Sequence, residues 1–117
     1  LGVTVLTSLN NKSLKQIGHT KKIDQLVLKQ ADLIKKSGCD GIVCSAQEAL
    51  MVRKKYKNLL IITPGIRLPG ESSDDQIRIT TPKEAFKNKV SGIVMGRSLI
   101  KGNILNNTKR LIDHLSK

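Results

Sequence analysis

Residues 59–67 read LLIITPGIR, a continuous apolar run that ends at a proline, a glycine and Arg67. An uninterrupted apolar run is typical of a strand that is covered on both faces of a parallel sheet. Further along the chain, residues 93–98 read IVMGRS and repeat the pattern, with Gly96 and Arg97 directly after the apolar run. A glycine lets backbone N–H groups approach an anion closely, and an arginine offers a planar fork of donors to phosphate oxygens. The two turns therefore predict one phosphate held from two neighbouring loops.

Outward from this stretch, further apolar runs alternate with segments of helical periodicity. Strands are expected at residues 3–6, 41–44, 59–62 and 93–95, and helices at 23–37, 46–55, 81–88 and 104–115, with a brief helical turn over 14–17. Gly38 is expected to end the first long helix, and Ser45 with Glu48 is expected to form a capping box at the start of the next. Thr81 followed by Pro82 is typical of the start of the third.

The alternation of strands and helices predicts a parallel sheet with helices packed outside it. Four such units make half of a (β/α)8 barrel, and the chain opens directly into a strand-like run at residues 3–6. We therefore expect an α/β fold in which residues 1–117 form the C-terminal half (strands 5–8) of one TIM-barrel domain, with the N-terminal half absent from this chain. A doubly wound sheet is the alternative, but its Gly-x-Gly-x-x-Gly fingerprint does not occur in the first strand–helix turn.

In such barrels the functional site lies at the carboxyl ends of the strands, and phosphate is commonly bound after the seventh and eighth. Here those positions are the long loop 64–80 and the turn 96–98, where a short helix would present its N–H groups to an anion. Arg67 and Gln76 would reach over from the loop to Arg97. Surface ion pairs are the alternative for the two arginines. Thr7, at the end of the first strand, could bond a ligand or merely cap the next turn.

The net charge of +12, from 21 Lys+Arg against 9 Asp+Glu, would permit binding to nucleic acid or to anionic substrates. The lysines, however, are spread over many predicted helices and loops. With one tyrosine and one phenylalanine, the chain has no aromatic platform on which bases could stack. Solvated lysines are therefore the favoured interpretation. No apolar run approaches the ~20 residues that cross a bilayer, and no signal peptide is visible.

Several other reactive side chains have ordinary interpretations. Cys39 and Cys44 match no zinc or redox motif and are expected to be buried, reduced thiols. The adjacent Asp74 and Asp75 would point to opposite sides of an extended chain, so we expect them to serve solvation or a turn rather than to share a ligand. His19 and His114 have no nearby serine-and-acid set for nucleophilic catalysis and are expected to be solvated.

Several blocks of the sequence, taken together, resemble the bacterial orotidine 5′-phosphate decarboxylase family, in order and at the spacing of that family. The blocks are residues 3–8 (VTVLTS), 41–49 (GIVCSAQEA), 63–67 (TPGIR), 75–76 (DQ), 78–79 (RI), 81–82 (TP) and 96–98 (GRS). The resemblance implies a (β/α)8 barrel that decarboxylates orotidine 5′-phosphate to uridine 5′-phosphate (UMP) in de novo pyrimidine biosynthesis. It further implies a cytoplasmic homodimer that uses no metal or organic cofactor, and neither nucleic acid nor membrane as a partner.

The resemblance also implies roles for six residues of the substrate-binding site. Arg67 and Arg97 would grip the phosphate, and Gly96 would add a backbone donor. Gln76 would bridge the phosphate and the base as its loop closes. Thr7 would meet the edge of the pyrimidine.

Pro64, the sixth residue, would line the pocket near the leaving carboxylate. The catalytic Asp-Lys-Asp set of the family lies in the first half of the barrel, and no D-x-K-x-x-D pattern occurs here. No catalytic residue is therefore expected in this chain, which should be inactive alone. Ser91 stands where the family often has an acidic residue. Two alternatives stay open: a related Mg²⁺-dependent sugar-phosphate decarboxylase or aldolase, and a basic nucleic-acid-binding module.

Overall fold

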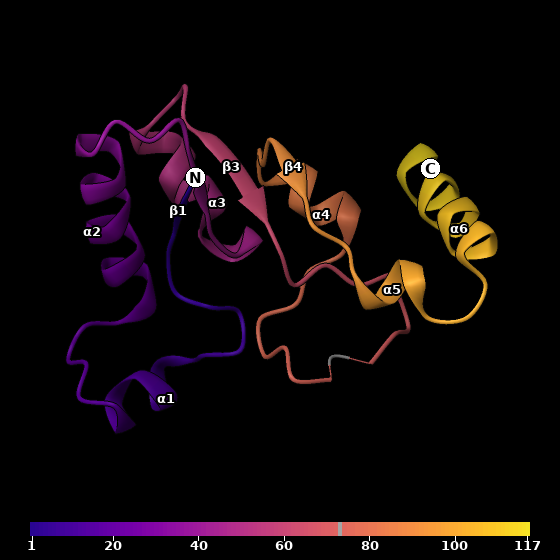
Figure 1. Ribbon diagram of the computed structural model, residues 1–117, viewed down its shortest axis with the longest axis horizontal. Coiled ribbons are helices and arrows are strands. Elements are labelled where there is room, and N and C mark those ends of the chain that lie inside the picture. Colours follow the sequence, from indigo (N-terminus) through magenta and orange to yellow (C-terminus); the bar gives the residue numbers. More distant parts are fainter. Residues whose placement is uncertain (73) are drawn as a thin grey trace.

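A computed structural model describes residues 1–72 and 74–117 and shows one parallel sheet with the strand order β1-β2-β3-β4 (Figure 1). The strands are β1 (Gly2–Val3), β2 (Gly41–Val43), β3 (Leu60–Thr63) and β4 (Gly92–Ile93). The helices are α1 (Asn11–Gln16), α2 (Ile23–Lys36), α3 (Ala46–Lys55), α4 (Pro82–Lys87), α5 (Arg97–Ile100) and α6 (Ile104–Ser116). Each strand is followed by at least one helix, so the predicted α/β class and the parallel sheet are confirmed.

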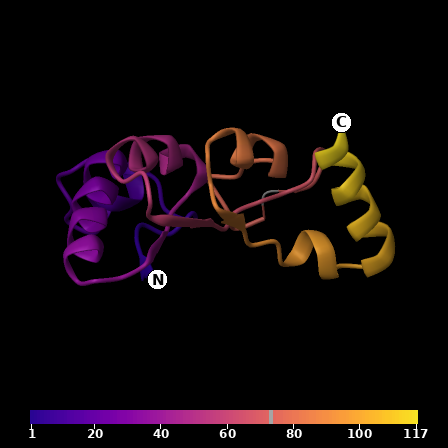
Figure 2. The same cartoon turned by 90° about the horizontal axis from the view of Figure 1, so that it is seen from above.

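The two faces of the sheet differ in how they are covered. Along one row the register places Val3 beside Val43, Val43 beside Ile62, and Ile62 beside Gly92. Val3, on this face, is 61% exposed. Ile42, which points the other way because side chains alternate along a strand, is fully buried. Helices α3 and α4 lie on the same side of the sheet in Figure 2. The exposure of Val3 and Leu60 indicates that the opposite face, which we call the uncovered face, is largely open among the described residues.

The hydrophobic core lies between the covered face and helices α2, α3 and α4. Its fully buried side chains are Val27, Ala31, Ile42, Ala49, Val52, Ile61, Ile66 and Ala85. They recur at helical spacing within α2 and α3, which explains why these segments form amphipathic helices with one apolar stripe against the sheet. The hydrophobic core therefore lies on one face of the sheet only.

The molecule is flat and elongated, with principal extents of 41 × 33 × 20 Å. Its radius of gyration is 14.8 Å, larger than the roughly 13.4 Å expected for a compact domain of this length. The chain termini lie far apart along the long axis (Figure 1). This open shape is consistent with part of a barrel. None of the helices in the described ranges is both long and apolar enough to cross a membrane.

Several predicted boundaries need correction. β1 and β4 are shorter than the predicted strands 3–6 and 93–95, since each pairs with a single neighbour over two residues only. α1 begins earlier than the predicted turn 14–17 because the side chain of Asn10 caps it, accepting from the backbone N–H of Ser13 at 2.9 Å. The short helix expected at 96–98 is present as α5.

The predicted caps have mixed outcomes. Thr81 and Glu84 form a complete capping box at the start of α4, with Pro82 in its first turn. Ser45 caps α3 as predicted, although its hydroxyl accepts from the backbone N–H of Gln47, one residue earlier in the helix than a capping box requires. The carboxylate of Glu48 turns inward instead and forms an ion pair with a loop arginine.

Candidate functional site

The loop that follows β3 is closed at its base by backbone hydrogen bonds. The N–H of Arg67 donates to the carbonyl of Thr80 at 3.1 Å, and the N–H of Thr80 donates to the carbonyl of Gly65 at 3.1 Å. Gly65 has φ +74°, and a Cβ atom there would lie 3.0 Å from the carbonyl oxygen of Arg78. Glycine is needed at this position because the backbone is left-handed and crowded. The start of the loop therefore has a defined shape that directs Arg67.

Arg67 is buried, with only 7% of the residue exposed. Its Nη1 donates to the carbonyl of Ile66 at 3.0 Å. Its Nε and Nη2 atoms are also buried, yet neither has a hydrogen-bond partner within residues 1–72 and 74–117. Buried guanidinium donors without partners are costly, because their lost hydration is not replaced. An anion bound beside Arg67 would supply the missing acceptors.

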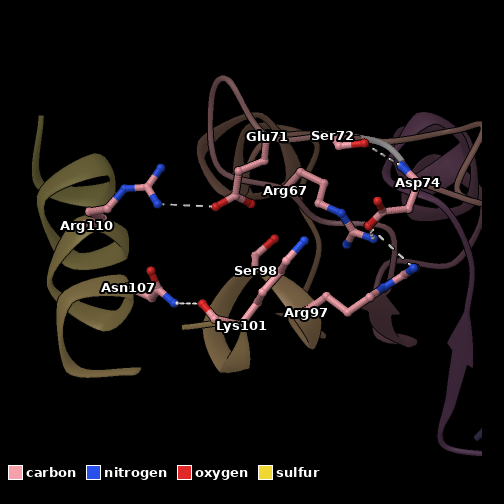
Figure 3. A pocket seen from close by; sticks show the side chains of 9 residues that line it. All are labelled: Arg67, Glu71, Ser72, Asp74, Arg97, Ser98, Lys101, Asn107 and Arg110. Atoms are coloured by element: carbon pink, nitrogen blue, oxygen red, sulfur yellow. Dashed lines mark hydrogen bonds and ion pairs between the residues drawn. The ribbon is translucent and has the colours of Figure 1, made fainter. Parts of the chain in front are cut away.

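Arg97, from the first turn of α5, points toward the same place (Figure 3). The carboxylate of Asp74 lies between the two guanidinium groups, 3.4 Å from Nη1 of Arg97 and 3.9 Å from Nη2 of Arg67. Asp75 forms a second ion pair with Arg97. Its hydrogen bond from Arg97 lowers the pKa of the Asp75 carboxyl, and the same contact raises the pKa of Arg97.

Asp74 and Asp75 lie exposed in a turn, as expected, and Asp74 adopts φ +49°. Both carboxylates also contact Arg97, which the sequence did not indicate. The ion-pair alternative holds for Arg97, whose side chain is 47% exposed. It does not account for Arg67, whose buried donors remain without hydrogen-bond partners among the described residues. The guanidinium groups of both arginines lie near Asp74, and their binding of a common phosphate stays a prediction.

Both arginines line a cavity of about 170 Å³ between the loop, α5 and α6, which we call the phosphate-side cavity. Ser98 also lines it; its Oγ is buried and has no hydrogen-bond partner in the described part of the chain. Figure 3 shows Ser98 and Lys101 extending from α5 toward Arg67. Arg110 of α6 closes the far side, 3.4 Å from Glu71. The cavity wall is therefore rich in cations.

A second cavity, of about 360 Å³, lies beside the ends of β1, β2 and β3, and we call it the base-side cavity. Thr7, Pro64 and Gln76 all line it. The hydroxyl of Thr7 donates to the side-chain oxygen of Gln76, so Thr7 neither caps the following turn nor stands free. Asp75 lines this cavity and pairs with Arg97 of the first, which connects the two. Gly96 precedes Arg97 as the N-cap of α5, and a Cβ there would meet no atom within 4 Å among the described residues.

The six predicted residues are thus brought together at one edge of the sheet, around two adjoining cavities. Sequence reasoning assigned no role to several other polar residues of the phosphate-side cavity, among them Ser98, Lys101 and Arg110. Ser98 directly follows Arg97 in the motif 96–98 (GRS), and this position could have indicated that Ser98 lines the site. Arg110 lies in a helix whose approach to the loop has no local signature in the sequence.

The remaining titratable residues contribute little chemistry. Burial, with a further effect from Glu48, raises the pKa of the Cys44 thiol to about 12, so this cysteine is uncharged; both cysteines are free thiols. His19 is exposed as expected, but His114 is half-buried with Nε2 unpartnered within the described ranges, so its expected solvation is wrong. No three His, Cys, Asp or Glu residues within 1–72 and 74–117 are grouped closely enough to hold a metal ion.

Comparison with known proteins places this geometry in a family. The model of the orotidine 5′-phosphate decarboxylase / HUMPS family matches residues 1–107. The chain is 44% identical over 100 residues to an orotidine 5′-phosphate decarboxylase of Coxiella burnetii, covering 85% of this chain and 42% of the relative. It is 45% identical over 100 residues to one from Pseudoalteromonas atlantica, covering 85% and 43%. The chain therefore spans less than half the length of the curated relatives it matches.

Solved structures agree. The crystal structure of orotidine 5′-phosphate decarboxylase from Lactobacillus acidophilus matches with a TM-score of 0.73 and 28% identity, over 98% of this chain and 48% of the other. That of orotidine 5′-monophosphate decarboxylase from Sulfolobus solfataricus matches with a TM-score of 0.62 and 16% identity, over 84% and 44%, and supports the fold alone. By sequence and by fold, the chain belongs to the orotidine 5′-phosphate decarboxylase / HUMPS family.

Proposed function

We propose that this chain supplies the phosphate- and pyrimidine-binding loops of an enzyme that decarboxylates orotidine 5′-phosphate to UMP in de novo pyrimidine biosynthesis. The observation that carries the proposal is the convergence of Arg67 and Arg97 on the phosphate-side cavity, directly beside the base-side cavity. A nucleoside monophosphate has the matching layout, with a dianion at one end and a planar base at the other. The names of the relatives support this substrate.

In the proposed complex, the phosphate takes the place of Asp74 between the two guanidinium groups. The dianion would accept from the unpartnered Nε and Nη2 of Arg67 and from the forked donors of Arg97. The first N–H groups of a helix lack intrahelical acceptors, so the turn at Gly96 can add a backbone donor. Ser98 would contribute its buried hydroxyl.

The pyrimidine would occupy the base-side cavity. Thr7 and Gln76 already form a hydrogen-bonded pair on its wall, so either can exchange that bond for one to the base edge. Gln76 follows Asp75, which contacts Arg97, and it therefore stands where phosphate and base would meet. Pro64 would present an apolar surface beside the leaving carboxylate.

We further propose that the four strands correspond to strands five to eight of a (β/α)8 barrel. The uncovered sheet face would then be half of the barrel interior, and the share of each relative that the chain matches, 42–48%, is what half a barrel predicts. The Asp-Lys-Asp set would come from the other half of the barrel, so this chain would bind substrate without decarboxylating it. The whole enzyme would work as a cytoplasmic homodimer without metal or organic cofactor.

The phosphate contacts are expected to contribute to turnover although they lie far from the reacting carbon. Binding energy from a remote group can hold the loop closed and offset the cost of arranging charges around the reacting carbon, C6 of the pyrimidine. Arg97 is half-exposed in this chain, but a bound dianion would bury the contact between them. In the full-length enzyme, Arg97→Ala is therefore expected to lower kcat/KM by the equivalent of about 2–5 kcal/mol, as for buried charge pairs that lose one partner. Steady-state assays with orotidine 5′-phosphate measure this directly.

Arg110→Ala is the matched control, because Arg110 lines the same cavity but is paired with Glu71. Its effect should be several-fold smaller than that of Arg97→Ala. An unchanged kcat/KM in Arg97→Ala, or equal losses in both variants, would refute the assigned phosphate grip.

The family description also includes HUMPS proteins, so a sugar phosphate is the second candidate substrate. The Thr7–Gln76 pair in the base-side cavity favours a nucleotide. UMP should therefore compete with inorganic phosphate at a lower concentration than ribose 5-phosphate does. A basic module for nucleic acid would instead show affinity that falls steeply with salt and no competition by UMP.

A further inference from the structure

Outside the two cavities, the described residues contain one fully buried ion pair, between Glu48 of α3 and Arg78 near the end of the loop. Their side chains are 8% and 7% exposed. Burial raises the pKa of the Glu48 carboxyl, while the guanidinium of Arg78 and the backbone N–H groups of Glu48 and Ser45 lower it again. None of the roles proposed above uses this pair.

Arg78 joins three segments that are far apart in the sequence. Its Nη1 binds Glu48, and its Nη2 donates to the carbonyls of Val5 at 3.1 Å and Leu6 at 3.2 Å. The backbone N–H groups of Ile77 and Arg78 both donate to the carbonyl of Thr7, at 3.1 and 3.0 Å. These hydrogen bonds fasten residues 5–7, after β1, to the end of the loop that follows β3, and Glu48 of α3 pairs with Arg78 at the same place.

These contacts adjoin two residues that line the base-side cavity, Thr7 and Gln76. Thr7 is one residue beyond the carbonyl of Leu6 that Arg78 binds, and Gln76 is two residues before Arg78. The hydrogen bond between Thr7 and Gln76 spans the same two segments. Gly65 approaches the carbonyl of Arg78 and the side chain of Thr7 from the other side. Displacement of Arg78 would therefore move both walls of the cavity.

We propose that Arg78, held by Glu48, is a positioning residue that sets the distance and orientation between Thr7 and Gln76 and so gives the site its preference for a pyrimidine nucleotide. The inference rests on the proposed function. A buried ion pair is often no better for stability than apolar side chains of similar volume, so its presence here is better explained by the geometry it imposes. The arginine fork presents one nitrogen to the carboxylate and a second to the two carbonyls, whereas a lysine would have to reach all three acceptors from a single nitrogen.

The test compares Arg78→Lys and the milder Glu48→Gln with a matched control, Arg53→Lys. Arg53 is also an arginine fork bound to carbonyls, those of Lys57 and Leu59 at 2.7 Å each, but it lies at the end of α3, away from both cavities. All variants are made in the whole chain. Two properties are measured: amide hydrogen exchange at Ile77 and Arg78, and affinity for UMP and for inorganic phosphate.

We expect Arg78→Lys to accelerate exchange at residues 77 and 78 and to weaken UMP binding about tenfold, as for loss of charge-assisted hydrogen bonds. The affinity for inorganic phosphate, which would contact only Arg67 and Arg97, should change by less than about twofold by the same reasoning. Glu48→Gln should act in the same direction with a smaller effect. Arg53→Lys should leave exchange at these two amides and both affinities as in the unmodified chain.

Unchanged exchange at residues 77 and 78, equal losses of UMP and phosphate affinity, or the same UMP loss in Arg53→Lys would overturn the positioning role. Failure of the proposed function has a different signature, in which the unmodified chain binds phosphate but shows no preference for UMP. In that case faster exchange in Arg78→Lys and Glu48→Gln, but not in Arg53→Lys, would still support the fastening of the two segments, and unchanged exchange would overturn it.

Discussion

Asp74 lies between Arg67 and Arg97, where the proposed phosphate would lie. The Asp74 carboxylate partly neutralises the two guanidinium groups. It therefore stabilises the loop and also competes with an incoming dianion. A bound phosphate would have to displace it. The charge of this one residue is therefore expected to reduce the affinity of the site.

Asp74→Asn removes the charge and keeps the backbone, because asparagine tolerates the left-handed conformation that Asp74 adopts at φ +49°. We expect inorganic phosphate to bind about two- to fivefold more tightly, the size of an exposed ion pair. Isothermal titration of the chain with phosphate measures the change. Asp24→Asn, which makes the same change of net charge on α2, is the control, and an equal gain there would show that only net charge matters.

Gly65 and Gly70 both have positive φ, at +74° and +82°, but only Gly65 is crowded. Gly70→Ala carries the cost of the left-handed backbone alone, about 1 kcal/mol. Gly65→Ala adds a contact at 3.0 Å to the carbonyl of Arg78 and should destabilise the fold by about 1–3 kcal/mol more, as overpacking does. Urea unfolding of both variants tests this difference, and equal losses of stability would contradict it.

At the scale of elements, arginines and caps join the strands to the helices that follow them. Arg53 of α3 donates from Nη2 to the hydroxyl of Ser91 at 3.0 Å, and Ser91 also accepts from the N–H of Ile61 at 3.0 Å. The serine thus fills the place where the resemblance implies an acid, and it still ties α3 to β3 and to the start of β4. Its position opposite the cavities explains why this departure does not touch the site.

Helix α4 starts at the capping box of Thr81 and Glu84, whose hydrogen bonds, chiefly from the Thr81 backbone, lower the pKa of the Glu84 carboxyl. A lowered folded-state pKa means that this stabilisation is present above the ordinary value of 4.5 and is lost as the pH falls below it. Glu84→Gln should therefore reduce stability at pH 7 by no more than about 1 kcal/mol, because solvent screens an exposed carboxylate.

At an acid pH well below the lowered pKa of Glu84, the difference in stability between the chain and Glu84→Gln should shrink toward zero, since both side chains are then uncharged. Urea unfolding at the two pH values gives the comparison. Asp113→Asn on α6, away from any capping box, is the control for the change of net charge alone. A difference for Glu84→Gln that is independent of pH would rule out the carboxylate as the stabilising form.

At the scale of the whole molecule, the uncovered sheet face is the dominant feature. Leu60 and Val94 are 48% and 52% exposed on strands whose other face is buried. Contiguous exposed apolar surface of this kind marks a site where another protein segment packs. In the proposed barrel that segment is the other half of the sheet.

Leu60→Ser should lower the binding of an apolar fluorescent dye by the chain, because it removes apolar area from the uncovered face. Leu33→Ser is the control, since Leu33 is 57% exposed but lies on helix α2. Dye fluorescence at equal protein concentration is the measurement. If Leu33→Ser reduced the signal as much as Leu60→Ser, the sheet face would not be the main apolar surface.

The local pattern of side chains was enough to predict the α/β class, the parallel sheet, the bounds of α3, the placement of Arg67 and Arg97 after strands, and that of Gln76 in the long loop. Periodicity, caps and turn residues act between neighbours in the chain, so they can be recognised without coordinates. Strand lengths were overestimated at β1 and β4, because pairing depends on the neighbouring strand.

Contacts between distant segments emerged only from the folded chain. The pairing of Asp74 with two arginines, the turn of Glu48 away from its cap toward Arg78, and the one-sided burial of the sheet all depend on how helices and loops pack in three dimensions. Which acceptor a side chain binds depends on which one lies within reach. Packing decides that distance, and separation along the chain does not.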